Sequence, residues 1–278
     1  MAEHLDGKVI CITGAGSGFG RLVAYLAGAG GAHIVATDID GAAARETAAA
    51  VEAAGGQAIG VTADVCSRVD LTRAVQAGIE QFGSLDVMVN NAGVMPLAFF
   101  ADHAAAADAW DRCIDINLKG VLNGIIAAHD PMIQQGRGHV VNISSIYGNY
   151  ANAGAAVYTA TKAAVNVLSE TLRVESQGKI KVTTVKPTGV PGTGLGAGVI
   201  NPEAIAGIVG HHGTTFFPNL MAYLSGALPP AQTDIDSIGY WTISPEDLAR
   251  QIIYVIDQPW GVTISDITVR AAGEEYVL

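Results

Sequence analysis

Lys8-Val9-Ile10-Cys11-Ile12-Thr13-Gly14-Ala15-Gly16-Ser17-Gly18-Phe19-Gly20 joins an apolar run to a glycine-rich turn, and a helical pattern begins at Gly18. Glycines let a backbone turn tightly and approach a ligand closely. The amino end of a helix offers unpaired N–H groups and a positive dipole end to a pyrophosphate. The strict G-x-G-x-x-G pattern is not matched here, so the position of the turn between a strand and a helix is what predicts a phosphate-binding turn.

Strand-like and helical patterns alternate along the rest of the chain. The expected strands are Val/Ile-rich and mostly lack polar alternation, as is typical of parallel strands buried on both faces. They span Lys8–Thr13, Ala32–Thr37, Gln57–Thr62, Leu85–Asn90, Gly138–Ser144, Ile180–Lys186 and Thr263–Val269. The expected helices span Gly18–Ala29, Ala42–Ala54, Arg68–Phe82, Ala104–Gln135, Ala156–Gln177 and Pro245–Asp257. This order predicts an α/β fold of three layers, a doubly wound Rossmann fold with a seven-stranded parallel sheet.

One segment, residues 188–240, interrupts this alternation. It contains no Lys or Arg, and it is rich in Gly, Pro and apolar residues. Because it follows the carboxyl end of a strand, where such folds bind ligands, we interpret it as a helical substrate-binding loop or lid. A peripheral helical pair packed on the core is the alternative. No linker divides the chain, so a single domain of residues 1–278 is expected.

Composition excludes several classes of partner. The net charge is −11, from 15 basic and 26 acidic residues, which argues against nucleic acid and membrane surfaces. Met1–Lys8 lacks the pattern of a secretory signal, and no apolar run is long enough to span a bilayer, so a cytoplasmic protein is expected. The three cysteines are too far apart for a metal motif. The adjacent side chains of His211 and His212 should point apart, so no metal site is predicted.

Polar residues mark the ends of the next strands. Asp38 follows the glycine turn at about the distance where a Rossmann acid accepts the ribose hydroxyls of NAD, and its carboxylate would repel the 2′-phosphate of NADP. Asp40 competes for this role, but it begins the next helix and should cap it. Asp64-Val65 and Asn90-Asn91-Ala92-Gly93 end the following strands, at the edge a cofactor would cross.

Tyr158 and Lys162 stand one helical turn apart, and Ser145 lies upstream at the end of an apolar run. Side chains at this spacing project from one face of a helix. An ammonium beside a phenol favours the phenolate, so Lys162 should lower the pKa of Tyr158. The phenol could then exchange a proton with a substrate oxygen near neutral pH.

Together these residues resemble the short-chain dehydrogenase/reductase family, in its shorter, single-domain branch. The match is carried, in the family's order and spacing, by Thr13-Gly14-x-x-x-Gly18-x-Gly20, Asp64, Asn90-Asn91-Ala92-Gly93, Asn117, Ser145 and Tyr158-x-x-x-Lys162. The resemblance implies that Tyr158 is the general acid/base and that Ser145, rather than Ser144, orients the substrate oxygen. It further implies that Lys162 holds the nicotinamide ribose, and that Asn117 anchors a water linking Lys162 to solvent.

The resemblance also implies a set of cofactor contacts. They are Gly14, Ser17, Gly18, Phe19, Gly20, Asp38, Ile39, Asp64, Val65, Asn91, Ala92, Gly93, Tyr158, Lys162, Pro187 and Val190. One departure stands after the sixth strand, where Thr188 replaces the family's usual glycine and Thr193 falls one place late. Relatives usually pair through two long helices, so a homodimer or homotetramer is expected.

These features predict an NAD(H)-dependent dehydrogenase that interconverts a bulky hydrophobic secondary alcohol and its ketone. Apolar residues of the 188–240 segment, with Met95, Leu97, Phe99 and Phe100, would form the pocket, although core packing explains them equally well. A reductase that uses NADPH and a cofactor-binding redox sensor are the alternatives. The epimerases of the extended branch would need glycine at Ser17 and a longer carboxyl-terminal domain.

Overall fold

The computed structural model describes residues 3–277, and its centre is a seven-stranded sheet with all strands parallel. The strand order is β3-β2-β1-β4-β5-β6-β7, so the chain reverses its direction of travel across the sheet between β1 and β4. Ligands of open α/β sheets bind outside the carboxyl ends of the strands at such a reversal. The strands are β1 (Val9–Thr13), β2 (His33–Asp38), β3 (Gln57–Thr62), β4 (Val87–Asn90), β5 (Gly138–Ile143), β6 (Ile180–Pro187) and β7 (Asp266–Val269).

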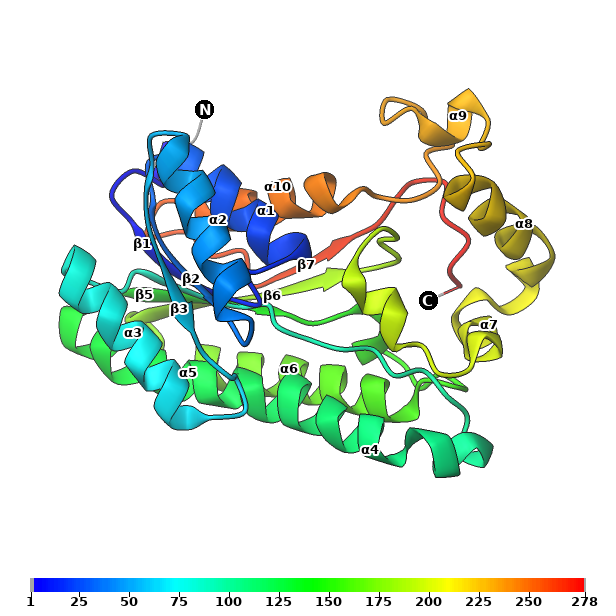
Figure 1. Cartoon of the computed structure of the whole chain (residues 1–278), viewed down its shortest axis with the longest axis horizontal. Coiled ribbons are helices and arrows are strands. Elements are labelled where there is room, and N and C mark those ends of the chain that lie inside the picture. Colours follow the sequence, from blue (N-terminus) through cyan, green and yellow to red (C-terminus); the bar gives the residue numbers. More distant parts are fainter. Residues whose placement is uncertain (1–2, 278) are drawn as a thin grey trace.

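Helices cover both faces of the sheet, as Figure 1 shows. One layer contains α1 (Gly18–Ala29), α2 (Gly41–Ala53) and α10 (Pro245–Ile256), and the other contains α3 (Arg68–Phe82), α5 (Gly120–Gln135) and α6 (Ala156–Glu175). Successive residues of β1 point to opposite faces, so Ile10 and Ile12 join one buried cluster while Val9 and Cys11 join the other. This confirms the predicted three-layer Rossmann-like fold, with element ends displaced by a few residues.

Side chains fix where several of these helices begin. Asp40 Oδ1 accepts the backbone N–H groups of Ala42 and Ala43, at 2.9 and 3.1 Å, and so caps α2. Ser244 and Asp247 form a reciprocal capping box at the start of α10. The predicted capping role of Asp40 is confirmed, which leaves Asp38 as the acid at the end of β2.

The prediction of one helix over Ala104–Gln135 is wrong in one respect. The helix is interrupted, because α4 (His103–Ile114) and α5 are joined by a π-helical turn at Asp115–Lys119. Such turns insert an extra residue and occur often at functional sites. Here the turn contains Asn117, whose side chain bonds to the backbone N–H and C=O of Val94.

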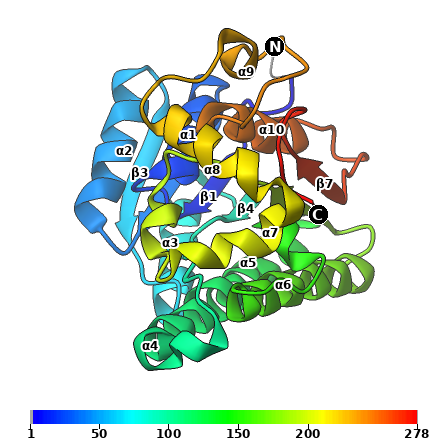
Figure 2. The same cartoon turned by 90° about the vertical axis from the view of Figure 1, so that its right-hand side faces the viewer.

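The 188–240 segment is helical and lies across the carboxyl edge of the sheet, where Figure 2 shows α7 and α8 in front. It contains α7 (Ala206–Val209), α8 (Gly213–Leu224) and α9 (Pro230–Thr233), with 3₁₀ turns at Gly194–Gly198, Pro202–Ile205 and Gly210–His212. None of the helices formed by residues 3–277 is both long and apolar enough to cross a lipid bilayer.

Candidate active site

The glycine turn connects β1 to α1 at the carboxyl edge of the sheet. Gly14 and Gly18 have φ angles of 65° and 50°, which favour glycine. A Cβ at Gly20 would lie 2.3 Å from the carbonyl oxygen of Gly14, so no side chain fits there. Ser17 precedes α1 without capping it through its side chain, and the first N–H groups of a helix have no intrahelical partner. The backbone geometry of an anion-binding turn is therefore present.

Asp38 is held directly against this turn. Its Oδ2 accepts the N–H of Gly16 at 2.9 Å, and its Oδ1 accepts the N–H of Asp40 at 3.0 Å. The neighbouring Ile39 side chain is exposed. The structure thus brings the end of β2 and the glycine turn together, as the sequence predicts for a ribose-binding acid.

The segment after β4 lies between the glycine turn and Lys162. Thr13 Oγ1 accepts the N–H groups of Asn91 and Ala92, at 3.0 and 3.1 Å, and Asn91 Nδ2 donates to the carbonyl of Thr13 at 2.8 Å. A Cβ at Gly93 would lie 3.7 Å from Lys162 Nζ. The backbone at 91–93 therefore links the two halves of the predicted site.

Asp64 and Val65 lie after β3, but their hydrogen bonds are made to the turn before α3 and to α5. Asp64 Oδ1 accepts the N–H of Cys66 at 2.9 Å, and the carbonyl of Val65 accepts from Asn123 Nδ2 at 2.9 Å. These contacts do not join the two residues to the glycine turn, so a cofactor contact there stays a prediction.

Tyr158, Lys162 and Ser145 form the polar centre of the site. Tyr158 and Lys162 are only 3% and 4% exposed, and Lys162 Nζ lies 5.7 Å from the centre of the Tyr158 ring. The Ser145 hydroxyl hydrogen bonds to the Tyr158 phenol. Ser144 instead donates to the carbonyl of Lys162 at 3.1 Å and shares a hydrogen bond with Asn166 at 2.6 Å. Ser145 is therefore the serine that faces the phenol.

The expectation that Lys162 lowers the pKa of Tyr158 is wrong for the contacts that the chain itself supplies. Burial raises the pKa of Tyr158, and the hydrogen bond from Ser145 offsets this only in part. The Lys162 ammonium donates to the carbonyl of Ile143 at 2.8 Å, and burial lowers its own pKa to about 8. Desolvation thus has the largest effect on the pKa of Tyr158, and a sequence pattern does not report burial.

Asn117 supports this centre from the π-helical turn. Its Oδ1 accepts the N–H of Val94 at 2.9 Å, and its Nδ2 donates to the carbonyl of the same residue at 2.8 Å. Nδ2 also lies 3.4 Å from the hydroxyl of Thr161, next to Lys162 on α6. The Asn117 side chain is therefore fixed against the loop after β4, and its predicted part in a water link stays a prediction.

Thr188, which departs from the family pattern after β6, contacts a residue near the carboxyl end of the chain. Pro187 ends β6, and the hydroxyl of Thr188 hydrogen bonds to the carboxylate of Glu274. Thr193 Oγ1 donates to the carbonyl of Val190 at 3.3 Å. Thr188 therefore anchors a carboxylate from the end of the chain, a contact open to it because it carries a hydroxyl where the family has glycine.

Sequence reasoning missed two aromatic residues of this site. The Tyr147 ring lies 5.5 Å from that of Tyr158, edge to face, and is itself buried. Tyr276 packs against the same apolar cluster from the end of the chain. Tyr147 could have been found from its position two residues after Ser145. Tyr276 lies in a short polar stretch that carries no comparable signal.

A buried apolar cluster surrounds Tyr158, with contributions from the 188–240 segment. Its members are Leu97, Cys113, Ile146, Tyr147, Ala155, Tyr158, Ala204, Ile208, Val209, Phe216, Leu228 and Trp241. Phe99 and Leu220 pack against it. The expectation that Phe100 also lines a pocket is wrong, because its side chain is exposed and lies edge to face with Trp110. Met221 and Leu224 are exposed as well, because they lie on the outer face of α8.

The expectation that His211 and His212 point apart is also wrong. Their rings lie 4.0 Å apart, centre to centre, in a 3₁₀ turn. Across residues 3–277, no group of three or more His, Cys, Asp or Glu side chains is placed to hold a metal ion. The histidine pair therefore has no further ligands within that range.

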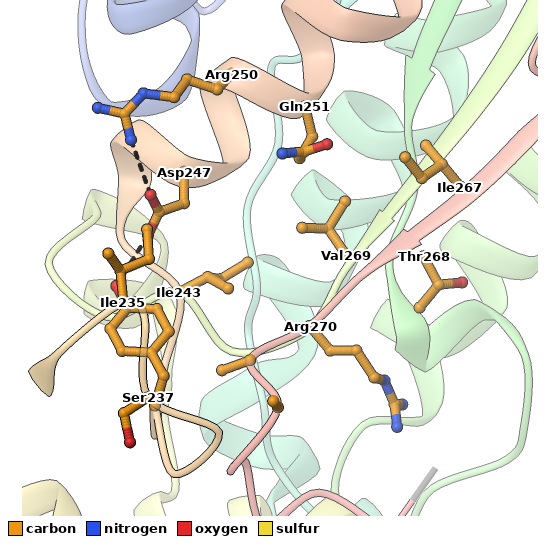
Figure 3. A pocket seen from close by; sticks show the side chains of 13 residues that line it. Ile235, Ser237, Ile243, Asp247, Arg250, Gln251, Ile267, Thr268, Val269 and Arg270 are labelled. Carbon is orange, nitrogen blue, oxygen red and sulfur yellow. Dashed lines mark hydrogen bonds and ion pairs between the residues drawn. The ribbon is translucent and has the colours of Figure 1, made fainter. Parts of the chain in front are cut away.

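A surface pocket of about 470 Å³ lies away from the polar centre. Figure 3 shows it between α10 and β7, with Asp247 and Arg250 paired at its margin. Its lining includes Gln251, Val269 and Arg270, and none of Ser145, Tyr158 and Lys162. The pocket is therefore separate from the candidate active site.

Comparison with known proteins agrees with this geometry. The family model described as short chain dehydrogenase matches residues 8–203. The uncharacterized oxidoreductase Lin0452 of Listeria innocua is 33% identical over 268 residues, which cover 95% of this chain and 96% of that protein. The 2,5-dichloro-2,5-cyclohexadiene-1,4-diol dehydrogenase LinX of Sphingobium indicum is 34% identical over 191 residues, 68% of this chain and 76% of its own.

Solved structures give the same result. A short-chain dehydrogenase/reductase from Burkholderia phymatum, in complex with NAD, has a TM-score of 0.74 and 27% identity over 95% of this chain and 89% of its own. An alcohol dehydrogenase from Thermococcus sibiricus, complexed with 5-hydroxy-NADP, shares the fold at the same TM-score of 0.74 with 18% identity over 96% of this chain and 97% of its own. The chain is an oxidoreductase that belongs to the short-chain dehydrogenase/reductase family.

Proposed function

We propose that this protein interconverts a bulky, neutral, hydrophobic secondary alcohol and its ketone with NAD(H). The observation that supports this most is the burial of the Ser145–Tyr158–Lys162 group within an apolar cluster built partly by the 188–240 segment. Water exclusion of this kind strengthens electrostatic interactions and suits transfer of a hydride. We further propose that residues 1–278 form one domain, in which this segment is the substrate-binding element.

Tyr158 Oη is the proposed proton-transfer atom. It donates a proton to the carbonyl oxygen during ketone reduction, and it accepts the hydroxyl proton during alcohol oxidation. Ser145 holds the same substrate oxygen by a hydrogen bond, and Lys162 keeps a positive charge near the phenol. When bound, the nicotinamide dinucleotide supplies the hydride acceptor or donor. Because burial raises the pKa of Tyr158, the chain's own contacts keep the phenol protonated at neutral pH, the form that donates the proton in ketone reduction.

The residues present fit a dinucleotide along the carboxyl edge of the sheet. The Gly14–Gly20 turn would hold the pyrophosphate, the Asp38 carboxylate the ribose hydroxyls, and the 91–93 backbone and Lys162 the nicotinamide half. Ser17, Phe19, Ile39, Asp64, Val65, Pro187 and Val190 complete the proposed contacts. The Asp38 carboxylate, held at the turn by Gly16, supports NAD over NADP.

NADP remains the second candidate because a cation does lie at the turn. The Arg21 guanidinium donates to the carbonyl of Gly16 and lies 3.5 Å from Glu46. We rank NADP second because the Glu46 carboxylate already neutralises this charge. Relatives of this fold have been solved with both cofactor types.

Replacing Asp38 by Ser should weaken the preference for NAD. A carboxylate facing the 2′-phosphate costs several kcal/mol, so Asp38→Ser should improve NADP binding by roughly tenfold or more, since about 1.4 kcal/mol corresponds to tenfold. The measurement is the dissociation constant of NADH and of NADPH, from quenching of protein fluorescence, alongside kcat/KM for each cofactor.

The matched control is Asp40→Ser, which removes a carboxylate two residues away. Serine preserves the cap of α2, so the NADH-to-NADPH ratio should stay at its wild-type value. If Asp40→Ser altered the ratio and Asp38→Ser did not, the assignment of the ribose-binding acid would be reversed.

The proposed substrate class rests on the 188–240 segment. Phosphorylated or coenzyme A-linked substrates usually pair with Lys or Arg, and this segment contains neither. Its buried members near Tyr158 are apolar, among them Ile208, Val209 and Phe216. One relative is named for a chlorinated cyclohexadienediol and another for 2-(S)-hydroxypropyl-CoM, so family membership alone does not select a substrate.

A panel assay tests the function directly. NADH oxidation, followed by absorbance, should be dependent on alicyclic or aryl ketones, and kcat/KM should be higher for these than for charged sugars. Preference for the charged sugars would refute the substrate class. Binding of NADH without any substrate-dependent oxidation across the panel would favour a cofactor-binding redox sensor instead.

We also propose a homodimer or homotetramer that pairs through α4–α5 and α6. Apolar side chains are exposed along these helices, namely Ile114, Leu122, Ile126, Val167 and Val174. Burying such side chains against a second copy of the chain would stabilise an oligomer. Light scattering of the purified protein would show a monomer if this proposal is wrong.

A further inference from the structure

The end of the described chain returns to the active site. The tail (residues 270–277) follows β7 and runs alongside the 188–240 segment, near α7 and α8 in Figures 1 and 2. Glu275 accepts hydrogen bonds from Trp241 Nε1 at 2.7 Å and from Asn219 Nδ2 at 3.1 Å. The N–H of Val277 donates to the carbonyl of Ile208 at 3.0 Å. The tail is therefore fixed to the segment that covers Tyr158.

These contacts place the Tyr276 phenol beside the loop after β6. Its hydroxyl oxygen lies 1.9 Å from where a Cβ on Gly189 would sit, so only glycine leaves room for it. The ring centre lies 5.6 Å from that of Phe216 on α8. Val190, the proposed nicotinamide contact, is the next residue along the chain. Tyr276 thus stands on the side of the site where a substrate would lie against the nicotinamide.

Tyr147 is a member of the same apolar cluster. Its ring contacts Tyr158 edge to face, with 5.5 Å between ring centres. Burial raises the pKa of Tyr147, and the nearby phenols of Tyr276 and Tyr158 raise it further. Tyr147 and Tyr158 belong to one buried cluster and Tyr276 packs against it, so both additional phenols border the surroundings of the proton-transfer residue.

Neither of these two phenols has its hydroxyl satisfied by the protein. Among residues 3–277, the hydrogen bonds of Tyr147 involve only its backbone, and the Tyr276 hydroxyl makes none. Neither hydroxyl oxygen is among the fully buried side-chain atoms that lack a partner in the described chain, so both are within reach of solvent or of a bound ligand. Two such hydroxyl groups beside one apolar cluster can therefore hydrogen bond to a polar acceptor group of a ligand.

The chemistry of that acceptor follows from the surrounding charges. The carboxylates of Glu274 and Glu275 raise the pKa of Tyr276 beyond the effect of burial, so its hydroxyl stays a donor. Negative charges this close disfavour an anionic group. A neutral oxygen, as in an alcohol or a ketone, accepts hydrogen bonds from both phenols without that penalty.

We propose that Tyr147 and Tyr276 form a second polar subsite, so that the substrate is a neutral diol or hydroxyketone with its second oxygen bound between these hydroxyls. This rests on the proposed oxidoreductase function and narrows its substrate class. The reacting oxygen lies at Tyr158 and Ser145, and the second oxygen lies across the apolar cluster from it. The tail is then a specificity element of the active site.

Matched substrate pairs test the subsite. The pairs are cyclohexanol against cyclohexane-1,2-, 1,3- and 1,4-diol, and cyclohexanone against 2-, 3- and 4-hydroxycyclohexanone, assayed with Tyr147→Phe, Tyr276→Phe and the double variant. Wild type should prefer at least one dioxygenated member in kcat/KM. Each single variant should lower that preference by roughly two- to tenfold, the range for losing one neutral hydrogen bond. The measured quantity is the ratio of kcat/KM for the dioxygenated member to that for its mono-oxygenated partner, so a loss shared by both substrates cancels.

Tyr254→Phe is the matched control, since it removes an exposed phenol from the outer face of α10. If wild type turns over cyclohexanol or cyclohexanone but prefers no dioxygenated partner, or if the preference survives in the double variant, the subsite is refuted while the oxidoreductase proposal stands. If no member of any pair is turned over, the subsite is refuted, and the proposed substrate class falls with it only if the aryl ketones of the panel also fail. The preference of the wild-type enzyme for a dioxygenated substrate tests the subsite even if a variant fails to fold.

Discussion

Tyr158→Phe should lower kcat/KM by roughly 10²–10⁴-fold, the usual contribution of a positioned general acid or base. The phenylalanine ring can keep the edge-to-face contact with Tyr147, whose centre lies 5.5 Å from that of Tyr158. Only the hydroxyl is lost, and with it the hydrogen bond from Ser145. The dissociation constant of NADH, measured by fluorescence quenching, should stay within about threefold of the wild-type value, because the ring hydroxyl contributes little to holding a dinucleotide.

Tyr150→Phe is the control for this experiment. Tyr150 lies in the same loop as Tyr147 but is 61% exposed, so its hydroxyl has no place in the buried group. Its removal should leave both turnover and NADH binding unchanged. A Tyr158→Phe enzyme with near wild-type turnover would remove Tyr158 Oη as the proton-transfer atom, and a large loss of NADH binding would assign it to the cofactor site instead.

Local sequence patterns predicted most of the fold because the responsible forces act over short stretches. Unalternating Val/Ile runs such as Val9–Thr13 become parallel strands buried on both faces. Asp40 and Ser244 begin helices because their side-chain oxygens accept N–H groups two or three residues away. The same locality explains the candidate active site, since Tyr158 and Lys162 stand one turn apart on α6.

Local patterns do not predict features that depend on contacts between distant parts of the chain. The carboxylate of Glu274 meets Thr188 only because β7 lies beside β6, and Tyr276 then reaches Gly189. The π-helical turn at Asn117 depends on a pairing with Val94. The predicted direction of the Tyr158 pKa shift was wrong for a related reason. Burial raises this pKa, and burial is a property of the packed molecule.

Lys162→Met should lower kcat/KM by roughly 10²–10³-fold while leaving the protein at least as stable as wild type. The loss of rate reflects removal of a charged group held beside the reacting oxygen. The stability follows from burial, which lowers the pKa of Lys162 from 10.5 to about 8. That gap corresponds to a cost of about 3 kcal/mol for burying the charge. Methionine removes this cost. It also leaves the carbonyl of Ile143 without its donor, which destabilises the variant by about 1–3 kcal/mol.

The pH dependence of the stability difference between wild type and Lys162→Met distinguishes a charge effect from a simple packing effect. Below pH 8 wild-type Lys162 is charged in both the folded and the unfolded protein, so the cost of burying it is present in full. Between pH 8 and 10.5 the folded protein loses the proton first, and the unfolded protein binds more protons than the folded one. Wild type should therefore gain stability relative to Lys162→Met as the pH rises through this window, measured as the difference in Tm.

Lys181→Met is the matched control for both readouts. Burial likewise lowers the pKa of Lys181 to about 8, and its ammonium donates to the carbonyl of Pro259 at 3.2 Å, away from Tyr158. It should show the same direction of pH-dependent Tm difference with unchanged kcat/KM. If Lys162→Met lost its activity only through unfolding, its Tm would fall well below that of wild type at pH 7. Wild type would then depend on the Lys162 ammonium for its fold as well as for proton transfer, contrary to the cost that burial of this charge predicts.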